Sequence, residues 1–345
     1  MIKRKHLLLT LSIMIILVLF LTTACSSSND KSDDVSMPEG EEVQQSEDIK
    51  WPTQPIEIVV PYSAGGDTDF NARALAKYLT EEIDESVVVV NISGGGGTIG
   101  MDEVINANPD GYRLVVNHCA MHMAEAFGVS NYGWDAFEPI ATYGQGTGEL
   151  LVVRSDFPAD TVSELIEETK RNPGKYKFGV NPGATSHYAA AKLTFEGADM
   201  NIVASGSASE RVVALKGNHL DIIVAAMPVI KDYVTTGEFK VIAAFTTERY
   251  PTYDSIPTMK EQGYDINFDH FYTLYAPKGT DPRIIEKLEK AIEKVVTTNE
   301  VYADDIRKAY NQVPFFMGKE ETVKFLTEQQ ESYMKDSEML RSFEF

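Results

Sequence analysis

The stretch IEIVVPYSAGGDTDFNARALAKYL, residues 56–79, decides the first unit of the fold. Residues 56–61 form a short β-rich apolar run, and residues 72–79 carry apolar side chains at helical spacing. Between these segments, Gly65 and Gly66 permit a tight turn because glycine lacks a Cβ atom. The stretch therefore predicts a strand, a glycine loop and a helix, in that order.

The same alternation of apolar runs, turns and helical patterns continues along the chain. Residues 87–90 and 112–116 are predicted as strands, with a glycine loop at 94–97 and a helix at 99–107 between them. A second series has strands at 150–153, 176–180, 221–225 and 241–245 and helices at 162–171, 209–216 and 229–235. Such alternation indicates an α/β fold with a parallel sheet covered by helices on both faces.

The length of the chain predicts two lobes. Roughly 295 residues follow the first 50, which is more than one hydrophobic core usually serves. A strand at 271–276 opens a C-terminal tail whose helix, with Ile284, Leu288 and Ile292 at helical spacing, is expected to pack back on the first lobe. We therefore assign residues 51–149 and 270–345 to lobe 1 and residues 150–269 to lobe 2.

The N-terminal stretch MIKRKHLLLTLSIMIILVLFLTTAC has the pattern of an export signal. A basic cluster at residues 3–5 precedes an apolar run at 7–21, and small residues lead up to Cys25. We expect residues 1–24 to be a signal peptide and Cys25 to become the lipidated N-terminus. An uncleaved membrane anchor is the alternative, but the apolar run is shorter than the roughly 20 residues that a span needs. In either case the globular part lies outside the membrane.

Composition limits the class of partner. Residues 25–50 are acidic and rich in Ser and Gln, so we predict a disordered acidic tether there. The whole chain has 52 acidic and 31 basic residues, a formal net charge of −21 at pH 7 and no basic cluster after Lys5. This balance repels polyphosphate, so nucleic acid is not expected as a partner. Besides Cys25, Cys119 is the other cysteine, and no disulfide framework is predicted.

Two strand-to-helix loops with small residues form the candidate ligand site. The amides of Gly65 and Gly66 precede a helix that Thr68 or Asp69 can cap, and free amides at a helix N-terminus attract anions. For one such loop, a plain tight turn is the alternative. The second loop has the same placement and consists of Asn181, Pro182, Gly183, Ala184, Thr185 and Ser186. If the two loops face each other, they can clamp a carboxylate.

Other features of these loops narrow the chemistry. Arg73, four residues after Asp69, is predicted to form an intrahelical ion pair with it. Neither loop has the lysine of a phosphate-binding P-loop, and residues 94–100 do not match a dinucleotide fingerprint, so a nucleotide ligand is disfavoured. A third small polar loop, with Ser205 and Gly206, is a candidate border of the same cleft.

The run HCAMHM, residues 118–123, combines imidazole, thiol and thioether groups, which suit soft metals such as copper. The other histidines of this part of the chain are scattered singly at His187, His219 and His270. We therefore rank lining of the ligand pocket first, ordinary packing second and metal binding third. His118 and Cys119, as neighbours on an extended segment, are expected to point apart, so a catalytic Cys–His pair is not predicted.

The order of these motifs resembles one family, the extracytoplasmic solute receptors of tripartite tricarboxylate transporters, also called Bug-type receptors. The resemblance covers residues 51–340. Its N-terminal part rests on Trp51-Pro52, Pro55-Ile56, Ile58-Val59-Val60-Pro61-Tyr62, Gly65-Gly66, Asp69, Ala72-Arg73, Gly95-Gly96-Gly97, Ile99-Gly100 and Pro109-Asp110-Gly111-Tyr112. Its C-terminal part rests on Asn172-Pro173-Gly174-Lys175, Gly183, His187, Leu215-Lys216-Gly217, Asp221, Gly237, Lys240, Ile256-Pro257-Thr258 and Gly263. Each piece is loose, but their joint order is specific.

The resemblance implies a two-lobed periplasmic-binding-protein-like fold (type II, Venus flytrap) with a mixed, mainly parallel sheet in each lobe, which closes on a small carboxylate. It implies a first-lobe clamp of Tyr62, Ser63, Gly65, Gly66, Thr68 and Asp69, with His118 and Cys119 beside it. It implies a second-lobe clamp of Asn181, Gly183, Ala184, Thr185 and Ser186, with Ser205 and Gly206 nearby. The chain departs from the family pattern at Ala64, at residues 117–119 and at residues 204–206.

We therefore expect a monomeric, lipid-anchored receptor on the outer face of the cytoplasmic membrane or in the periplasm. As the resemblance implies, it captures a di- or tricarboxylate or a related acid and delivers it to integral membrane transporter subunits. No cofactor, metal or catalytic residue is predicted. The first alternative is a soft-metal-binding lipoprotein that uses residues 118–123. A surface hydrolase that uses Cys119 and a plain adhesive lipoprotein are further alternatives.

Overall fold

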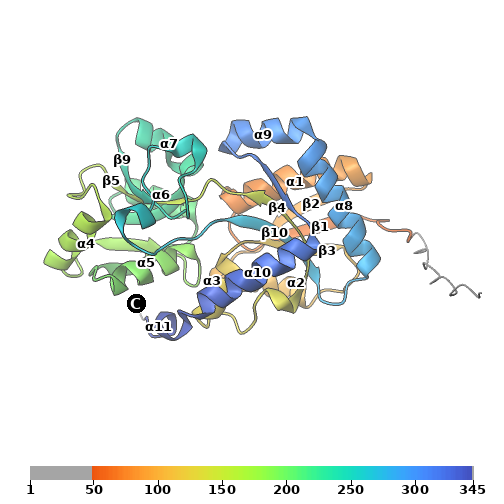
Figure 1. Ribbon diagram of the computed structural model, residues 1–345, viewed down its shortest axis with the longest axis horizontal. Coiled ribbons are helices and arrows are strands. Elements are labelled where there is room, and N and C mark those ends of the chain that lie inside the picture. The colour runs from red at the N-terminus through yellow and green to blue at the C-terminus, as the bar shows by residue number, and fades with distance from the viewer. Residues whose placement is uncertain (1–48, 344–345) are drawn as a thin grey trace, which may run out of the picture. The chain divides into compact units, whose positions relative to one another are not determined.

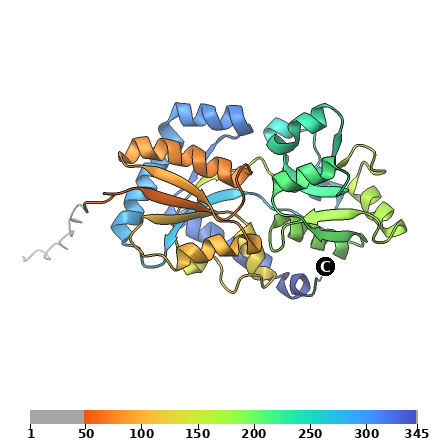
Figure 2. The same cartoon turned by 180° about the vertical axis from the view of Figure 1, so that it is seen from behind.

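The computed structural model describes residues 49–343 (Figure 1). The predicted signal peptide, the lipidation site at Cys25 and all but the end of the predicted tether lie outside the described residues. The segment Glu47–Phe345 forms one compact unit. Within it, two sheets with their covering helices lie side by side, and we call them lobe 1 and lobe 2 (Figures 1 and 2).

Lobe 1 contains a six-stranded sheet in the order β11-β4-β10-β3-β1-β2. Its strands are β1 (Ile56–Val60), β2 (Val87–Asn91), β3 (Arg113–Asn117), β4 (Phe137–Gln145), β10 (Phe271–Pro277) and β11 (Pro314–Met317). One face packs on α1 (Asp67–Ile83), α8 (Pro282–Thr298) and α9 (Glu300–Tyr310). The other face packs on α2 (Thr98–Ile105), α3 (Ala120–Ala126) and α10 (Lys319–Met334). The predicted packing of α8 on lobe 1 is confirmed.

Lobe 2 contains a five-stranded sheet in the order β7-β6-β8-β5-β9. Its strands are β5 (Glu149–Arg154), β6 (Lys177–Val180), β7 (Asn201–Ala204), β8 (Ile222–Ala226) and β9 (Phe239–Ala244). One face packs on α4 (Val162–Arg171) and α5 (Thr185–Phe195), and the other on α6 (Ala208–Lys216) and α7 (Met227–Thr235). Both sheets thus have helices on both faces, as predicted.

Both sheets are mixed. Strand β1 pairs in parallel with β2 and β3, and β6 pairs in parallel with β7 and β8. The other strand pairs in the described part of the chain are antiparallel and involve β4, β5, β9, β10 and β11. The parallel share is smaller than the sequence suggested. Strands β5 and β10 follow the two segments that join the lobes, and each runs opposite to its neighbours, outside the βαβ units that make parallel pairs.

The chain passes between the lobes at several places. Residues 146–148 join β4 to β5, and residues 245–270 join β9 to β10. The C-terminal helix α11 (Ser337–Arg341) contacts α3, and its residue Leu340 belongs to a core cluster that includes strands of lobe 2. The boundaries between the lobes that we assigned from the sequence stay a prediction.

The sequence pattern missed β4 and α3. The extended segment predicted for residues 118–123 is wrong, because Cys119 already has helical dihedral angles and α3 begins at the next residue. Ala120, Met121 and Ala124 are good helix formers, and all three are buried in α3. The residues of this short helix thus have both a high helix propensity and buried positions. A window of six residues does not show that they form a helix.

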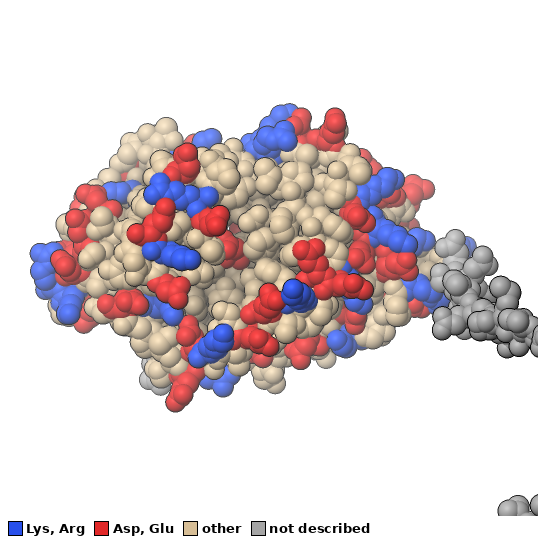
Figure 3. Space-filling view, viewed as in Figure 1, with Lys and Arg blue, Asp and Glu red and all other residues tan. Residues whose placement is uncertain are grey.

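The exterior of the described part is charged. Figure 3 shows Lys and Arg side chains interspersed with Asp and Glu over one face. Some of them form exposed ion pairs, such as Lys77 with Asp305 at 2.9 Å and Lys294 with Glu82 at 2.8 Å, and pairs of this kind each contribute little stability. Across residues 49–343, every helix is too short or too polar to cross a membrane.

The buried side chain of His122 makes the fold acid-sensitive. Both of its ring nitrogens lack hydrogen-bond partners among the described residues, and the ring stacks on Tyr333 with centroids 6.1 Å apart. Burial lowers the pKa of His122 to about 3. Below about pH 6.5 the unfolded chain therefore binds a proton that the folded chain does not bind. The free energy of unfolding consequently falls as the pH falls from that value.

We expect His122→Leu to reduce this loss by about 1.4 kcal/mol per pH unit, the effect of one proton. Chemical denaturation at a series of pH values between about 6 and about 4 measures it. Met123→Leu, a neighbouring buried substitution without a titratable group, is the control and should keep the wild-type slope. Equal acid-side slopes in His122→Leu and the wild type would contradict the prediction.

Candidate functional site

A cavity of about 280 Å³ lies between lobe 1 and lobe 2. Lobe 1 contributes the segments that follow β1, β2 and β3, together with the start of α1. Lobe 2 contributes the segments that follow β6 and β7, with the starts of α5 and α6. The cavity therefore lies at the carboxyl ends of parallel strands, where ligands of open α/β sheets bind.

The structure brings most of the predicted ligand-binding residues to this cavity. The lining includes Tyr62, Ser63, Gly66, Thr68, Asp69 and His118 from lobe 1 and Asn181, Ala184, Thr185, Ser186 and Gly206 from lobe 2. The lining does not include Gly65, Cys119, Gly183 or Ser205. Gly65 and Gly183 shape the two loops instead, because their φ angles of 86° and 77° favour glycine. Contact of any of these residues with a ligand stays a prediction.

The two predicted loops present uncapped helix starts to the cavity. Gly66 is the N-cap of α1 and Ala184 is the N-cap of α5, and neither has a side chain that bonds to the helix. The amides of both first turns are therefore available, and they carry the positive end of a helix dipole. In contrast, Ser207 and Glu210 form a capping box at the start of α6, which also borders the cavity.

The predicted capping of α1 by Thr68 or Asp69 is wrong, because both residues lie inside the first turn of the helix. The Asp69 carboxylate accepts hydrogen bonds from the Gly65 amide (3.0 Å) and from Asn91 (2.9 Å). It also pairs with Arg73 at 2.9 Å, so the predicted ion pair is confirmed. Burial raises the pKa of Asp69, but these hydrogen bonds outweigh it and lower the pKa. Asp69 thus fixes the glycine loop.

The sequence pattern did not single out four other residues of the wall, which are Asp67, Glu149, Arg211 and His270. Asp67 Oδ2 accepts hydrogen bonds from Nδ1 of His270 (3.0 Å) and from the Tyr272 hydroxyl (2.6 Å). Burial would raise the pKa of Asp67, yet the hydrogen bond and charge of His270 lower it. Asp67 is therefore ionised at neutral pH.

His270 lies between two carboxylates. Its Nε2 atom is 3.6 Å from Glu149 Oε2, on the side opposite to Asp67. Burial lowers the pKa of His270, but Cys119, Asp67 and Glu149 raise it well above its usual value. The ring of His270 therefore lies against two acids. The sequence contained one sign that Glu149 is special: it is a charged residue at the start of the apolar strand ELLVV.

Arg211 is a buried cation, with 4% of its surface exposed. Nη1 donates to the carbonyl oxygen of Gly206 (2.6 Å) and Nη2 to that of Val224 (3.0 Å). Its Nε atom has no hydrogen-bond partner among the described residues. A weak sign of its burial was present in the sequence. Arg211 precedes Val212 and lies four residues before Leu215, and all three are on the buried side of α6.

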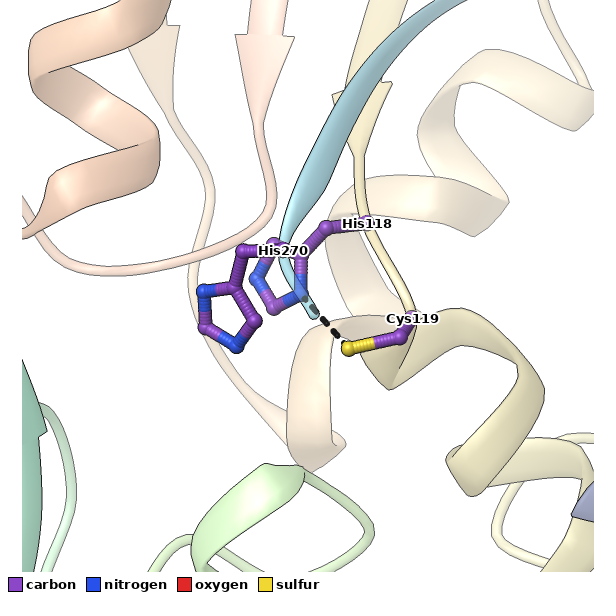
Figure 4. Close-up of side chains that lie close together, drawn as sticks. All are labelled: His118, Cys119 and His270. Atoms are coloured by element: carbon purple, nitrogen blue, oxygen red, sulfur yellow. Dashed lines mark hydrogen bonds between the residues drawn. The ribbon is translucent and has the colours of Figure 1, made fainter. Parts of the chain in front are cut away.

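His118 and His270 of this wall form a cluster with Cys119, which is not part of the lining (Figure 4). The Cys119 sulfur is 3.7 Å from Nδ1 of His118, so the prediction that these two side chains point apart is wrong. They converge because the chain turns into α3 at Cys119. His270 is not isolated either, since its ring stacks on His118 with centroids 4.2 Å apart. Nitrogen and sulfur atoms of the three residues lie within 4.8 Å of one another, so this cluster is the candidate for a metal.

The rest of the run 118–123 does not join this cluster. Met121 packs in a core cluster of lobe 1, and Met123 packs in the cluster that includes strands of lobe 2. His122 lies against Tyr333. Burial lowers the pKa of His118 to about 3 and raises that of Cys119, so both groups are neutral in the physiological range. The run is therefore divided between the cavity wall and the core.

Two α/β lobes with a cavity between them form the architecture of the periplasmic-binding-protein class. Residues 71–338 match the family model described as "Tripartite tricarboxylate transporter family receptor". The chain therefore belongs to this receptor family, as the sequence motifs indicated.

Relatives and solved structures agree with this assignment. The chain is 31% identical to the "UPF0065 protein in gbd 5'region" of Cupriavidus necator, over 82% of this chain and 86% of that protein. It is 29% identical to protein BugT of Bordetella pertussis, over 73% and 79%. The structure is similar to that of the periplasmic binding protein BugD, with a TM-score of 0.76 and 27% identity over 84% of this chain and 98% of that chain. The malate-bound MatC of Rhodopseudomonas palustris has the same fold, with a TM-score of 0.72 and 21% identity over 83% and 100%.

The lobes approach closely at Gly96, which lies in the short 3₁₀ turn Gly95–Gly97 of lobe 1. A Cβ atom there would lie 2.3 Å from the carbonyl oxygen of Pro182 in lobe 2. We therefore expect Gly96→Ala to hold the lobes apart. Double electron–electron resonance between spin labels at the exposed residues Glu81 and Glu196, one in each lobe, should then show a longer distance than in the wild type.

Gly174→Ala is a matched control for Gly96→Ala. Both glycines have nearly the same left-handed backbone, with φ of 65° and 67°, but nothing lies within 4 Å of a Cβ atom at Gly174. Both variants should lose about 1 kcal/mol of stability from backbone strain, whereas only Gly96→Ala should change the distance between the lobes. The same distance in Gly96→Ala and the control would show that this contact does not limit closure.

Proposed function

We propose that this protein is an extracytoplasmic receptor that binds a small organic carboxylate between its lobes and delivers it to integral membrane transporter subunits. One observation carries the proposal: an uncapped helix start from each lobe opens on the same cavity. Free amides at helix N-termini bind anions. Membership of the tripartite tricarboxylate transporter receptor family supports both the transport role and the membrane partner.

Capture requires no chemistry in this proposal. Each lobe supplies one set of amides, with the hydroxyls of Thr68, Thr185 and Ser186 beside them. A ligand that contacts both sets stabilises the closed arrangement over an open one, because only closure brings the sets together. The transporter subunits then recognise the closed form. We propose that the receptor works as a monomer.

The N-terminus supplies the membrane attachment in this proposal. The support is the sequence pattern of residues 1–25, with Cys25 as the lipidation site. Stable retention needs more than one acyl chain, which a bacterial lipoprotein cysteine normally carries. Residues 25–50 would then link the lipid to the lobes on the outer face of the cytoplasmic membrane or in the periplasm.

We expect at least one organic acid to raise the melting temperature of the full-length protein purified in detergent. The panel should contain mono-, di- and tricarboxylates with and without amino groups, and it should include malate. A ligand at 100 times its dissociation constant stabilises the folded state by about 2.7 kcal/mol, which a thermal-shift assay detects. Ala184→Asp, which places a carboxylate at the open start of α5, should abolish the shift without unfolding the protein. The absence of any shift across the panel would refute the proposal.

A soft-metal-binding lipoprotein is the second candidate, because His118, Cys119 and His270 lie within 4.8 Å of one another. The geometry disfavours it, since the two imidazole rings are stacked with centroids 4.2 Å apart and planes inclined by 24°. A nitrogen lone pair lies in the plane of its own ring, so a metal in the plane of one ring lies outside the plane of the other. We therefore expect elemental analysis of the purified protein to show far less than one copper or zinc ion per chain. A stoichiometric metal content that Cys119→Ser removes would establish the second candidate instead.

A further inference from the structure

We propose that the ligand is a small zwitterion with a protonated amine as well as a carboxylate, and that the amine faces Glu149 and Asp67 while the carboxylate faces Arg211 and the start of α5. This inference rests on the proposed function and specifies the substrate class of the same cavity. Its basis is that the cavity wall contains one buried acid and one buried base that do not pair with each other.

Glu149 is the acid without a hydrogen-bond donor. It is 6% exposed, lines the cavity, and its carboxylate accepts no hydrogen bond from the described residues. The Nε2 atom of His270 is 3.6 Å away, within ion-pair distance but too far for a hydrogen bond. A buried carboxylate without a donor is costly. An ammonium group supplies three N–H donors.

Asp67 extends this acidic side of the cavity. Its Oδ2 atom accepts hydrogen bonds from His270 and Tyr272, whereas none of the described residues donates to Oδ1. The His270 ring lies between the two carboxylates, with Nδ1 3.0 Å from Asp67 and Nε2 3.6 Å from Glu149. A ligand with only carboxylates would place further acidic groups beside these two, whereas an amine supplies N–H donors to them.

Arg211 is the unpaired base. Its two hydrogen bonds go to backbone carbonyl oxygens, and none of the described acids lies within ion-pair distance of it. Two of its five N–H donors are used in this way, so the guanidinium keeps donors for a carboxylate. These donors match the carboxylate of the ligand, and the carboxylate of Glu149 matches its ammonium group.

The two helix starts fix the orientation of the ligand. The first turn of α1 contains Asp67 and Asp69, so its positive end already faces carboxylates of the protein. The first turn of α5 contains no acidic residue. Its amides at Thr185 and Ser186 are therefore the better place for the ligand carboxylate, and they belong to the same lobe as Arg211. The amine then points toward the carboxylates of Glu149 and Asp67.

Matched ligand pairs test the proposal in the wild-type protein. Each pair differs by one amino group: L-aspartate and succinate, L-glutamate and glutarate, 2-aminoadipate and adipate, and L-alanine and propionate. Isothermal titration of the full-length protein in detergent should show that, in at least one pair, the amine-bearing acid binds at least tenfold more tightly. Equal or tighter binding of the amine-free acids in every pair that binds would overturn the inference and leave the proposed function intact. Binding of none of these acids would overturn the inference, and the wider thermal-shift panel would then decide the proposed function.

Substitution at Glu149 provides an independent test. Glu149→Gln keeps the shape of the side chain and removes its charge, so we expect at least a tenfold loss of affinity for the amine-bearing acid and a much smaller change for its amine-free partner. Glu196→Gln, an exposed substitution at the end of α5, is the control and should change neither affinity. Equal losses for both members of the pair, or no loss, would show that Glu149 does not recognise an amine. Melting without ligand verifies that both variants fold.

Discussion

The amides at the starts of α1 and α5 have no partners inside their helices, and the centre of the molecule is organised around this need. A buried polar group without a partner costs about 1–3 kcal/mol. Some other helices meet the need with side chains, such as Thr161 at α4, Ser207 at α6 and Asn299 at α9, whereas α2, α7 and α10 also begin without a side-chain cap. At α1 and α5, which border the cavity, the N-cap residues are Gly66 and Ala184, whose side chains cannot cap. A ligand oxygen can therefore take the place of the missing cap there.

The charged groups of the cavity lie where the two lobes are joined. Glu149 is the first residue of β5 and follows the segment 146–148 that joins the lobes. His270 is the last residue of the joining segment 245–270 and directly precedes β10. Asp67, at the start of α1, holds His270 from the side of lobe 1. Movement of one lobe relative to the other would change the distances among these three groups. Ligand charge and lobe closure are thus coupled through the same side chains.

Close approach of the lobes depends on glycine at the rim of the cavity. Gly96 of lobe 1 meets the carbonyl oxygen of Pro182, and a Cβ atom at Gly183 of lobe 2 would lie 3.1 Å from Val129 of lobe 1. Both glycines have positive φ angles. Side chains at these positions would separate the lobes and expose the helix starts to water, where amides and charges interact more weakly with a ligand.

The sequence by itself determined most of the regular elements and the two loops of the cavity. Apolar periodicity and turn residues act over a few positions, so α4 was predicted at its observed bounds and β1 and α1 were recognised on either side of Gly65 and Gly66. It did not reveal β4 or α3, whose patterns are ambiguous over a short window. Only the tertiary structure decided that Asp67 and His270, 203 residues apart, form one charged group with Glu149. The reason is physical: a lone Glu, Arg or His gives the same local pattern whether it faces water or a cavity, and its partners are set by how distant segments pack.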